Sequence, residues 1–199
     1  MDKLVQLLNY CATHPDASVR FTASNMILAI ESDTSYLSVT KGRSRAAGYF
    51  YLLTNKPPSP SGNLNQTAPS ISCASQVMHE VLSSAAEAEL GALFHNEKEA
   101  CPLRFALEEL RHPQPATTMV THNNTARDIV TNTVKQKRSK AIDVRFYWIR
   151  NRIRQGQFQI YRRKGQTNRA NYFSKHHPAS HHQATRSTYL NHTYSPHLA

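Results

Sequence analysis

The sequence MILAIESDTSYLSVTKGRSRAAGYFYLL occupies residues 26–53 and contains two apolar runs joined by a short basic segment. The first run, MILAI, is rich in Ile and Leu and predicts a buried strand over residues 19–32. The second run, AAGYFYLL at residues 46–53, is rich in Tyr, Phe and Leu, and the aromatic residues favour strands. Residues 41–45 contain one glycine and three basic side chains and are typical of a turn. The stretch therefore predicts a β-hairpin, with Asp33 just past the end of its first strand.

Apolar periodicity predicts the remaining elements. The clearest helix covers residues 83–99, where Ser83 or Ser84 with Glu87 forms a capping pattern and Pro102 is expected to stop or kink the helix. Neighbouring strands come first along the chain and strands then alternate with helices, so we expect an α/β fold with a mixed sheet of about five strands flanked by helices. The other predicted elements are strands at residues 71–74, 117–121 and 158–162, helices at residues 2–13, 103–111, 125–132, 141–154 and 168–175, a loop at residues 55–69, and an irregular segment after Pro178.

Length and composition restrict the class of protein. A chain of 199 residues suits one ordinary domain and a tail. Three widely spaced cysteines, Cys11, Cys73 and Cys101, give neither a disulfide framework nor a zinc pattern, which favours a reducing intracellular compartment. The first residues lack the features of a secretory signal, and no apolar run reaches the ~18 residues of a membrane span. We therefore expect a cytoplasmic or nuclear protein without a membrane segment.

Positive charge is concentrated in the last third of the chain. The formal net charge is +11, and the residues from Lys135 onward contain 14 Lys and Arg against the single acid Asp143. A one-sided basic surface is typical of proteins that bind a polyanion. A solvated basic tail has the same charge pattern, so charge alone leaves both interpretations open.

Five segments carry motifs in a consistent order along the chain. They are SDTSYLSVTKGRSRAAGYFYL (32–52), SSAAEAELGALFHNEKEA (83–100), VTHNNTARDIV (120–130), KRSKAIDVRFYWIRNRIRQGQFQIY (137–161) and TNRANYFSKHHP (167–178). Together they resemble the ribonuclease H domain of a copia-type LTR retrotransposon Pol polyprotein, the C-terminal part that follows the reverse transcriptase. The resemblance implies a ribonuclease H-like domain over residues 26–178, a connecting segment over residues 1–25 and a flexible, basic and His-rich tail over residues 179–199. No polymerase motif of the type Tyr/Phe-x-Asp-Asp occurs, so a reverse transcriptase is expected only as a partner in the ancestral polyprotein.

The resemblance implies an endonuclease that hydrolyses the RNA strand of RNA–DNA hybrids with two metal ions. Two Mg²⁺ ions, or Mn²⁺ in their place, lie ~4 Å apart and stabilise the attacking and leaving oxygens. Such hard ions are held by clustered carboxylates, which the family supplies from four positions. The first two map to Asp33 and to Glu89, the latter because Leu-Gly-Ala follows it as in the family. Glu87 is the alternative, and it projects ~200° away from Glu89 around a helix.

The other two positions depart from the family pattern, since they hold His122 and Asn171 in place of aspartates. Imidazole suits softer metals than Mg²⁺, and neither side chain brings a negative charge. Asp128 follows His122 by six residues, inside the next predicted helix, and is not expected to substitute. The resemblance therefore leaves Asp33 and Glu89 as metal ligands and predicts weak or absent nuclease activity.

Substrate binding is expected along the basic segment, through the phosphate backbone and without reading of bases. The side chains expected to bind nucleic acid are Lys135, Lys137, Arg138, Lys140, Arg150, Arg152 and Arg154. The histidines near the C-terminus lack the Cys partners and context of a zinc site, and no structural zinc is expected there.

Three functions remain open from the sequence. The chain is an impaired hybrid nuclease, a non-catalytic nucleic-acid-binding module, or a decayed retroelement fragment without function. Missing carboxylates argue against a fully active nuclease, the concentrated positive charge favours a binding module, and the Pro- and Asn-rich loop at residues 55–69 fits a decayed fragment.

Overall fold

The structure is a computed structural model that describes residues 2–21, 23–53, 69–131 and 140–192. Nearly all of the loop predicted at residues 55–69 lies outside the described residues. The chain divides into two compact units, one formed by residues 23–176 and one formed by the two chain ends.

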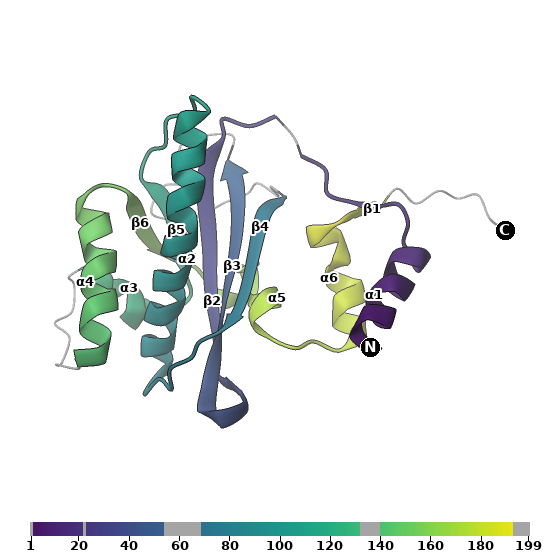
Figure 1. The fold of residues 1–199 in the computed structure, drawn as a ribbon, viewed down its shortest axis with the longest axis horizontal. Coiled ribbons are helices and arrows are strands. Elements are labelled where there is room, and N and C mark those ends of the chain that lie inside the picture. Colours follow the sequence, from purple (N-terminus) through teal and green to yellow (C-terminus); the bar gives the residue numbers. More distant parts are fainter. Residues whose placement is uncertain (1, 22, 54–68, 132–139, 193–199) are drawn as a thin grey trace. The chain divides into compact units, whose positions relative to one another are not determined.

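Residues 23–176 are built around one five-stranded mixed sheet (Figure 1). Strands β2, β3 and β4 are antiparallel neighbours, whereas β5 runs parallel to β2 and β6 runs parallel to β5. This arrangement confirms the α/β fold with a mixed sheet of about five strands. The strands are β2 (Ile27–Val39), β3 (Arg43–Leu53), β4 (Ser70–Val77), β5 (Thr117–Thr121) and β6 (Phe158–Arg162), in the spatial order β4-β3-β2-β5-β6.

β2 differs from its prediction at both ends, and β3 begins at residue 43 in place of the predicted residue 46. β2 begins at residue 27 and not at residue 19, because Met26 has a positive φ of 57° that interrupts the extended backbone. The strand then continues past residue 32, since β3 pairs with it over its whole middle part. Asp33 therefore lies inside β2, opposite Ala47, and the prediction that it follows the strand end is wrong.

Three helices pack on one face of the sheet, and one short helix lies on the other face (Figure 1). On the first face, helices α2 (Ala85–Glu109), α3 (Asn124–Val130) and α4 (Lys140–Arg154) form the hydrophobic core with the strands. On the second face, Phe173 of α5 (Asn171–Ser174) stacks on Tyr49 of β3. The fully buried side chains of the core include Leu28, Ile30, Phe50, Leu93, Met119, Ile149 and Phe158.

Pro102 does not stop α2, which is one continuous helix of 25 residues. Proline removes one backbone hydrogen bond from a helix interior. The turns on both sides of it are held by tertiary contacts, since Ala100 and Leu107 are buried in the core. In addition, Arg104 donates from Nη1 to Thr117 Oγ1 at 2.5 Å and to Pro115 O at 2.7 Å. These contacts outweigh the missing hydrogen bond.

The middle of α2 approaches the sheet closely at Gly48. A Cβ atom at this position would lie 2.3 Å from Asn96 Oδ1, so only glycine leaves room for the Asn96 side chain. Asn96 Nδ2 donates to Ser32 Oγ at 2.8 Å and to Ala47 O at 2.9 Å. These buried hydrogen bonds fix α2 against the part of β2 that carries Asp33.

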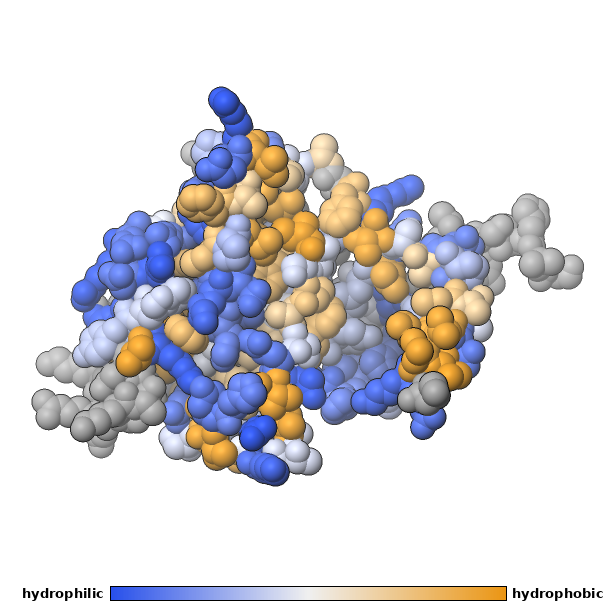
Figure 2. Space-filling model, in the orientation of Figure 1, coloured by the Kyte–Doolittle hydropathy of each residue, from blue (hydrophilic) through white to orange (hydrophobic). Residues whose placement is uncertain are grey.

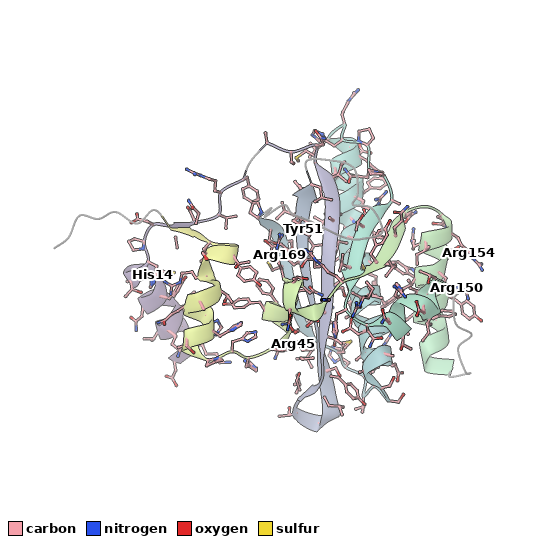
Figure 3. The ribbon with its side chains drawn as sticks, turned by 180° about the vertical axis from the view of Figure 1, so that it is seen from behind. His14, Arg45, Tyr51, Arg150, Arg154 and Arg169 are labelled. Carbon is pink, nitrogen blue, oxygen red and sulfur yellow. The ribbon has the colours of Figure 1, made fainter. Side chains whose placement is uncertain are left out.

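A buried ionic network lies on the second face of the sheet. Glu31 of β2 accepts from Arg163 Nη1 at 2.9 Å and from the backbone N–H of Arg169 at 2.5 Å. The guanidinium of Arg169 lies 5.3 Å from the ring centre of Tyr49 and 5.2 Å from that of Tyr51, and Figure 3 shows it beside Tyr51. This network holds the segment before α5 on the sheet.

The two chain ends form the second unit, which contains helices α1 (Asp2–Thr13) and α6 (Ala179–Tyr189) and the antiparallel strands β1 (Ala17–Ser18) and β7 (Asn191–His192). The sequence predicts α1 but only an irregular segment in place of α6. Contacts with α1 account for the second helix, since the guanidinium of Arg186 lies 5.3 Å from the ring centre of Tyr10. Apolar side chains gather over α1 (Figure 2), and none of its residues is buried. None of the helices in the described parts of the chain is both long and apolar enough to cross a membrane.

Glu97 is a fully buried carboxyl group in α2, and neither of its oxygens has a hydrogen-bond partner among the residues that the structure describes. Burial raises its pKa well above the ordinary value of 4.5, and the charge of Arg152 lowers it by less. Between the unfolded and the folded pKa, the native carboxyl keeps a proton that the unfolded chain has lost. The contribution of Glu97 to stability is therefore lost as the pH rises from about 4.5.

We expect Glu97→Gln to stabilise the protein at neutral pH, because the amide has nearly the same shape and never needs to be charged. The free energy of unfolding should rise by roughly 1–3 kcal/mol at pH 7.5, and the difference should vanish near pH 4. Urea unfolding followed by the fluorescence of the single tryptophan, Trp148, measures both values. Glu99→Gln, on the exposed side of the same helix, is the control and should leave the free energy of unfolding unchanged at both pH values. A gain that is the same at both pH values would contradict this protonation of Glu97.

Candidate active site

Asp33 lies in the central strand β2 with 1% of its surface exposed. Its Oδ2 atom accepts a hydrogen bond of 2.5 Å from Ser174 Oγ in α5. The carbonyl of Ser174 accepts from Ser35 Oγ at 2.6 Å, so the short helix is fastened to β2 at Asp33 and at Ser35.

Glu89, and not Glu87, lies beside Asp33. Glu89 is in α2, is 1% exposed, and accepts a hydrogen bond of 2.9 Å on Oε2 from Thr121 Oγ1 of β5. Glu87 instead accepts from the backbone N–H of Ser83 at 2.7 Å and from its hydroxyl at 2.5 Å. The Ser84 side chain caps the helix by accepting from the Glu87 N–H, so Glu87 belongs to the helix N-terminus.

His122 follows β5 directly and brings its imidazole to both carboxylates. Its Nδ1 atom lies 2.8 Å from Asp33 Oδ1 and 3.1 Å from Glu89 Oε1. The ligand atoms of these three residues all lie within 4.8 Å of one another, and no other group of metal-ligating side chains in the described part of the chain is as compact. Strand β2, helix α2 and the end of β5 therefore meet at one cluster.

The cluster shifts the pKa values of His122 and Glu89. The hydrogen bond to Asp33 raises the pKa of His122 above 6.5, and the charges of Glu89 and Asp33 add to this effect, whereas burial and Lys175 oppose it. Burial raises the pKa of Glu89 to about 7, with a smaller increase from Asp33 and a decrease from His122. The cluster thus retains protons near neutral pH that free side chains would lose, and a protonated His122 offsets the negative charge of the carboxylates.

Asn171, at the fourth predicted position, makes a contact outside the cluster. Its Oδ1 atom accepts a hydrogen bond from the ammonium group of Lys175. Asn168, three residues earlier, donates to Ser32 O at 2.8 Å and is buried, which anchors the turn before α5. Asp128 is paired with Arg127, whose Nη2 lies 2.6 Å from its Oδ1. Asp128 does not join the cluster of Asp33, Glu89 and His122, and the amide oxygen of Asn171 is bound to Lys175.

These side chains do not fit a pair of Mg²⁺ ions. Two Mg²⁺ ions need several hard oxygen ligands and negative charge to balance them. The cluster offers two carboxylates, one of which has a pKa of about 7, and an imidazole. The ammonium of Lys175 binds Asn171, the residue at the fourth predicted position, and its charge disfavours a second cation there.

Arg150 and Arg152 of α4 lie against aromatic rings of the same helix. The guanidinium of Arg150 lies 4.9 Å from the ring centre of Phe146, and that of Arg152 lies 5.0 Å from that of Trp148. Arg154 is exposed in the last turn, and Figure 3 shows Arg150 and Arg154 on this helix. Of the other residues predicted to bind nucleic acid, Lys135, Lys137 and Arg138 lie outside the described residues, as does the side chain of Lys140.

Three side chains at the site were not predicted from the sequence, namely Thr121, Ser174 and Lys175. Thr121 binds Glu89 and Ser174 binds Asp33 through single hydroxyl groups, and such contacts leave no pattern in a sequence. The one available signal was position, because Ser174 and Lys175 follow Asn171 within the predicted helical turn.

The fold is that of ribonucleases H. A ribonuclease H1 isolated from compost by a metagenomic approach superposes with a TM-score of 0.51 at 13% identity, over 74% of this chain and 91% of that one. The N-terminal ribonuclease H domain of a Mycobacterium tuberculosis protein gives 0.50 at 11% identity, over 75% and 91%. The compost enzyme in complex with an RNA/DNA hybrid gives 0.51 at 13% identity, over 73% and 92%. No family model and no curated protein matches the sequence. At these identities the comparisons establish a ribonuclease H-like fold.

Asp33 is the largest cause of the raised His122 pKa, so removing its charge should lower that pKa. We expect Asp33→Asn to shift the imidazole pKa of His122 downward in an NMR titration of the ring resonances, with His122 assigned from its absence in His122→Gln. Asp128→Asn removes a carboxylate that pairs with Arg127 and should leave the value unchanged. The same pKa in the natural chain and in Asp33→Asn would disprove the contact.

Proposed function

We propose that this chain is a ribonuclease H-like domain that binds RNA–DNA hybrids and hydrolyses them weakly or not at all. The observation that carries the proposal is the imidazole of His122 between Asp33 and Glu89, in a fold shared with ribonucleases H. These two carboxylates are the catalytic and metal-binding residues of the ancestral reaction in this proposal. Because His122 and Asn171 replace the other two carboxylates, the two Mg²⁺ or Mn²⁺ ions of that reaction are held poorly.

The proposed hybrid-binding surface is the basic face of α4 and the segment before it. Arg150 and Arg154 are four residues apart and share one face of α4, whereas Arg152 is half-buried beside Trp148 and would take part from the edge of this face. Phosphate contacts need positive charges spaced along a backbone and no base-specific groups. A solved ribonuclease H with the same fold has an RNA/DNA hybrid bound, which supports a hybrid as the ligand. Lys135, Lys137, Arg138 and Lys140 extend the proposed surface along the sequence.

The proposed origin is the C-terminal part of a copia-type retrotransposon polyprotein, where a reverse transcriptase domain would be the ancestral partner. The order of the five sequence motifs supports it. In this proposal residues 26–178 are the ribonuclease H-like domain, residues 1–25 the connecting segment and residues 179–199 a basic tail, in an intracellular protein.

Cleavage of a labelled RNA–DNA hybrid tests the loss of activity. We expect the natural chain to be inert in Mg²⁺ and in Mn²⁺, and His122→Asp/Asn171→Asp to cut the RNA strand, because it restores four carboxylates. His79→Asp/Asn151→Asp makes the same charge change at exposed positions and should remain inert. Cleavage by the natural chain that Asp33→Asn abolishes would overturn the proposal of lost activity. A folded double variant that binds hybrid but never cuts it would favour a binding module without this catalytic ancestry.

Binding of hybrid by the natural chain should depend steeply on salt. We expect Arg150→Ala/Arg154→Ala to weaken binding and to reduce the slope of log K against log[salt] by roughly 2, since each phosphate contact adds about 0.9 to the slope. Fluorescence anisotropy of a labelled hybrid between 50 and 200 mM salt, about the range over which such effects are large, measures the slope. Lys3→Ala/Arg20→Ala removes two exposed charges from the other unit and is the control. Equal slopes for all three proteins would exclude α4 as the binding surface, and an unfolded circular-dichroism spectrum would favour a decayed fragment.

A further inference from the structure

We propose that Asp33, Glu89 and His122 form a site for a single divalent transition-metal ion of the Zn²⁺ type, in preference to Mg²⁺. The site uses residues of the ancestral cluster but differs from it in the number and kind of ions that it binds. It requires neither hybrid binding nor hydrolysis.

Two of the three donor separations are close to those around one ion. His122 Nδ1 lies 2.8 Å from Asp33 Oδ1 and 3.1 Å from Glu89 Oε1, and one ligand atom from each of the three residues lies within 4.8 Å of the others. Donors at 2.0–2.2 Å from a shared Zn²⁺ lie about 3–3.5 Å from each other. An ion that takes the place of the imidazole proton therefore needs the three side chains to adjust around it but no new ligand.

Glu89 supplies an independent indication of a ligand. Its side chain is 1% exposed, and within the described parts of the chain its Oε1 atom has no hydrogen-bond partner, although His122 Nδ1 lies 3.1 Å from it. A buried carboxylate oxygen without a donor is costly unless a cation binds it. Its other oxygen accepts from Thr121, just as the second oxygen of Asp33 accepts from Ser174. In each carboxylate, one oxygen is bound by a hydroxyl group and the other oxygen is directed at His122. Hydrogen bonds of this kind orient the ligands in the outer shell of a metal site.

The chemistry of the three donors selects the ion. A neutral imidazole with carboxylates suits Zn²⁺ and its neighbours in the first transition row, whereas Mg²⁺ prefers an octahedron of oxygens and retains its waters. Two carboxylates balance the charge of one divalent ion. Three protein ligands leave one tetrahedral position for water, and the side chain of His122 is 36% exposed, so the ion can enter from solvent.

Titration of the full chain with Co²⁺ in place of Zn²⁺, read from its visible absorption, tests the site. We expect one equivalent to bind with a tetrahedral spectrum, and a hundredfold excess of Mg²⁺ to leave the spectrum unchanged. His122→Gln and Glu89→Gln should weaken this binding at least about tenfold, as even loss of an outer-shell partner does in other metal sites. His181→Gln, in the His-rich end of the chain, should leave it unchanged. Circular dichroism checks that each variant is folded.

A second measurement uses only the natural chain and so does not depend on the folding of a variant. Substoichiometric Co²⁺ should shift or broaden the NMR resonances of the His122 ring before those of the other histidines. Equal Co²⁺ affinity and stoichiometry in the natural chain and in His122→Gln would overturn the proposal, as would displacement of Co²⁺ by Mg²⁺ or perturbation of the C-terminal histidines first. None of these outcomes depends on hybrid binding, so failure of the metal site and failure of the proposed function are distinguishable.

Discussion

Two buried carboxylates on the central strand impose the constraint on which the rest of this structure depends. Glu31 and Asp33 both lie in β2, and neither is more than 1% exposed. A carboxylate so buried is tolerated only with charged or hydrogen-bonding partners. Glu31 accepts hydrogen bonds from Arg163 and from the backbone N–H of Arg169. Asp33 accepts a hydrogen bond from Ser174 and pairs with His122. Every one of these partners follows β5 in the chain. The buried charges of β2 therefore fix the C-terminal segments of the domain on one face of the sheet, whereas apolar packing fixes α2, α3 and α4 on the other.

The same constraint explains the position of His122. Asp33 and Glu89 come from different elements and form a pair of like charges in a buried setting, which needs a proton or a cation to be stable. In a two-metal nuclease the ions supply that positive charge. Here the imidazole lies within 3.1 Å of both carboxylates, and the ammonium of Lys175 binds Asn171 at the neighbouring position. His122 and Lys175 thus provide the positive charge that, in the proposed ancestral site, came from bound metal ions.

The sequence predicts the elements of the fold better than their ends. Strands β5 and β6 match their predicted residues, because a short β-prone run between turn-forming residues leaves little choice of boundary. The end of β2 and the continuity of α2 through Pro102 were missed, since both depend on tertiary contacts, with β3 in one case and with Thr117 and Pro115 in the other. At the site, the helical repeat separates Glu87 from Glu89, but it does not say which of the two faces Asp33. The partners Thr121 and Ser174 are set by packing across the sheet, which a single sequence does not encode as a pattern.

Stability and catalysis make opposite demands on this cluster. Four carboxylates in one buried pocket repel each other whenever the metals are absent, so an active site of that kind is stable chiefly when it is loaded. Replacing one carboxylate by an imidazole and another by an amide removes that repulsion and lets the metal-free domain keep its ionic contacts satisfied. Among the described residues of the cluster, the carboxylate oxygen still without a hydrogen bond is Glu89 Oε1. In the proposed descent from a nuclease, the substitutions that weaken the binding of two Mg²⁺ ions therefore also stabilise the fold in the absence of metal. Glu89 Oε1 is the carboxylate oxygen of the cluster that a bound cation would still stabilise.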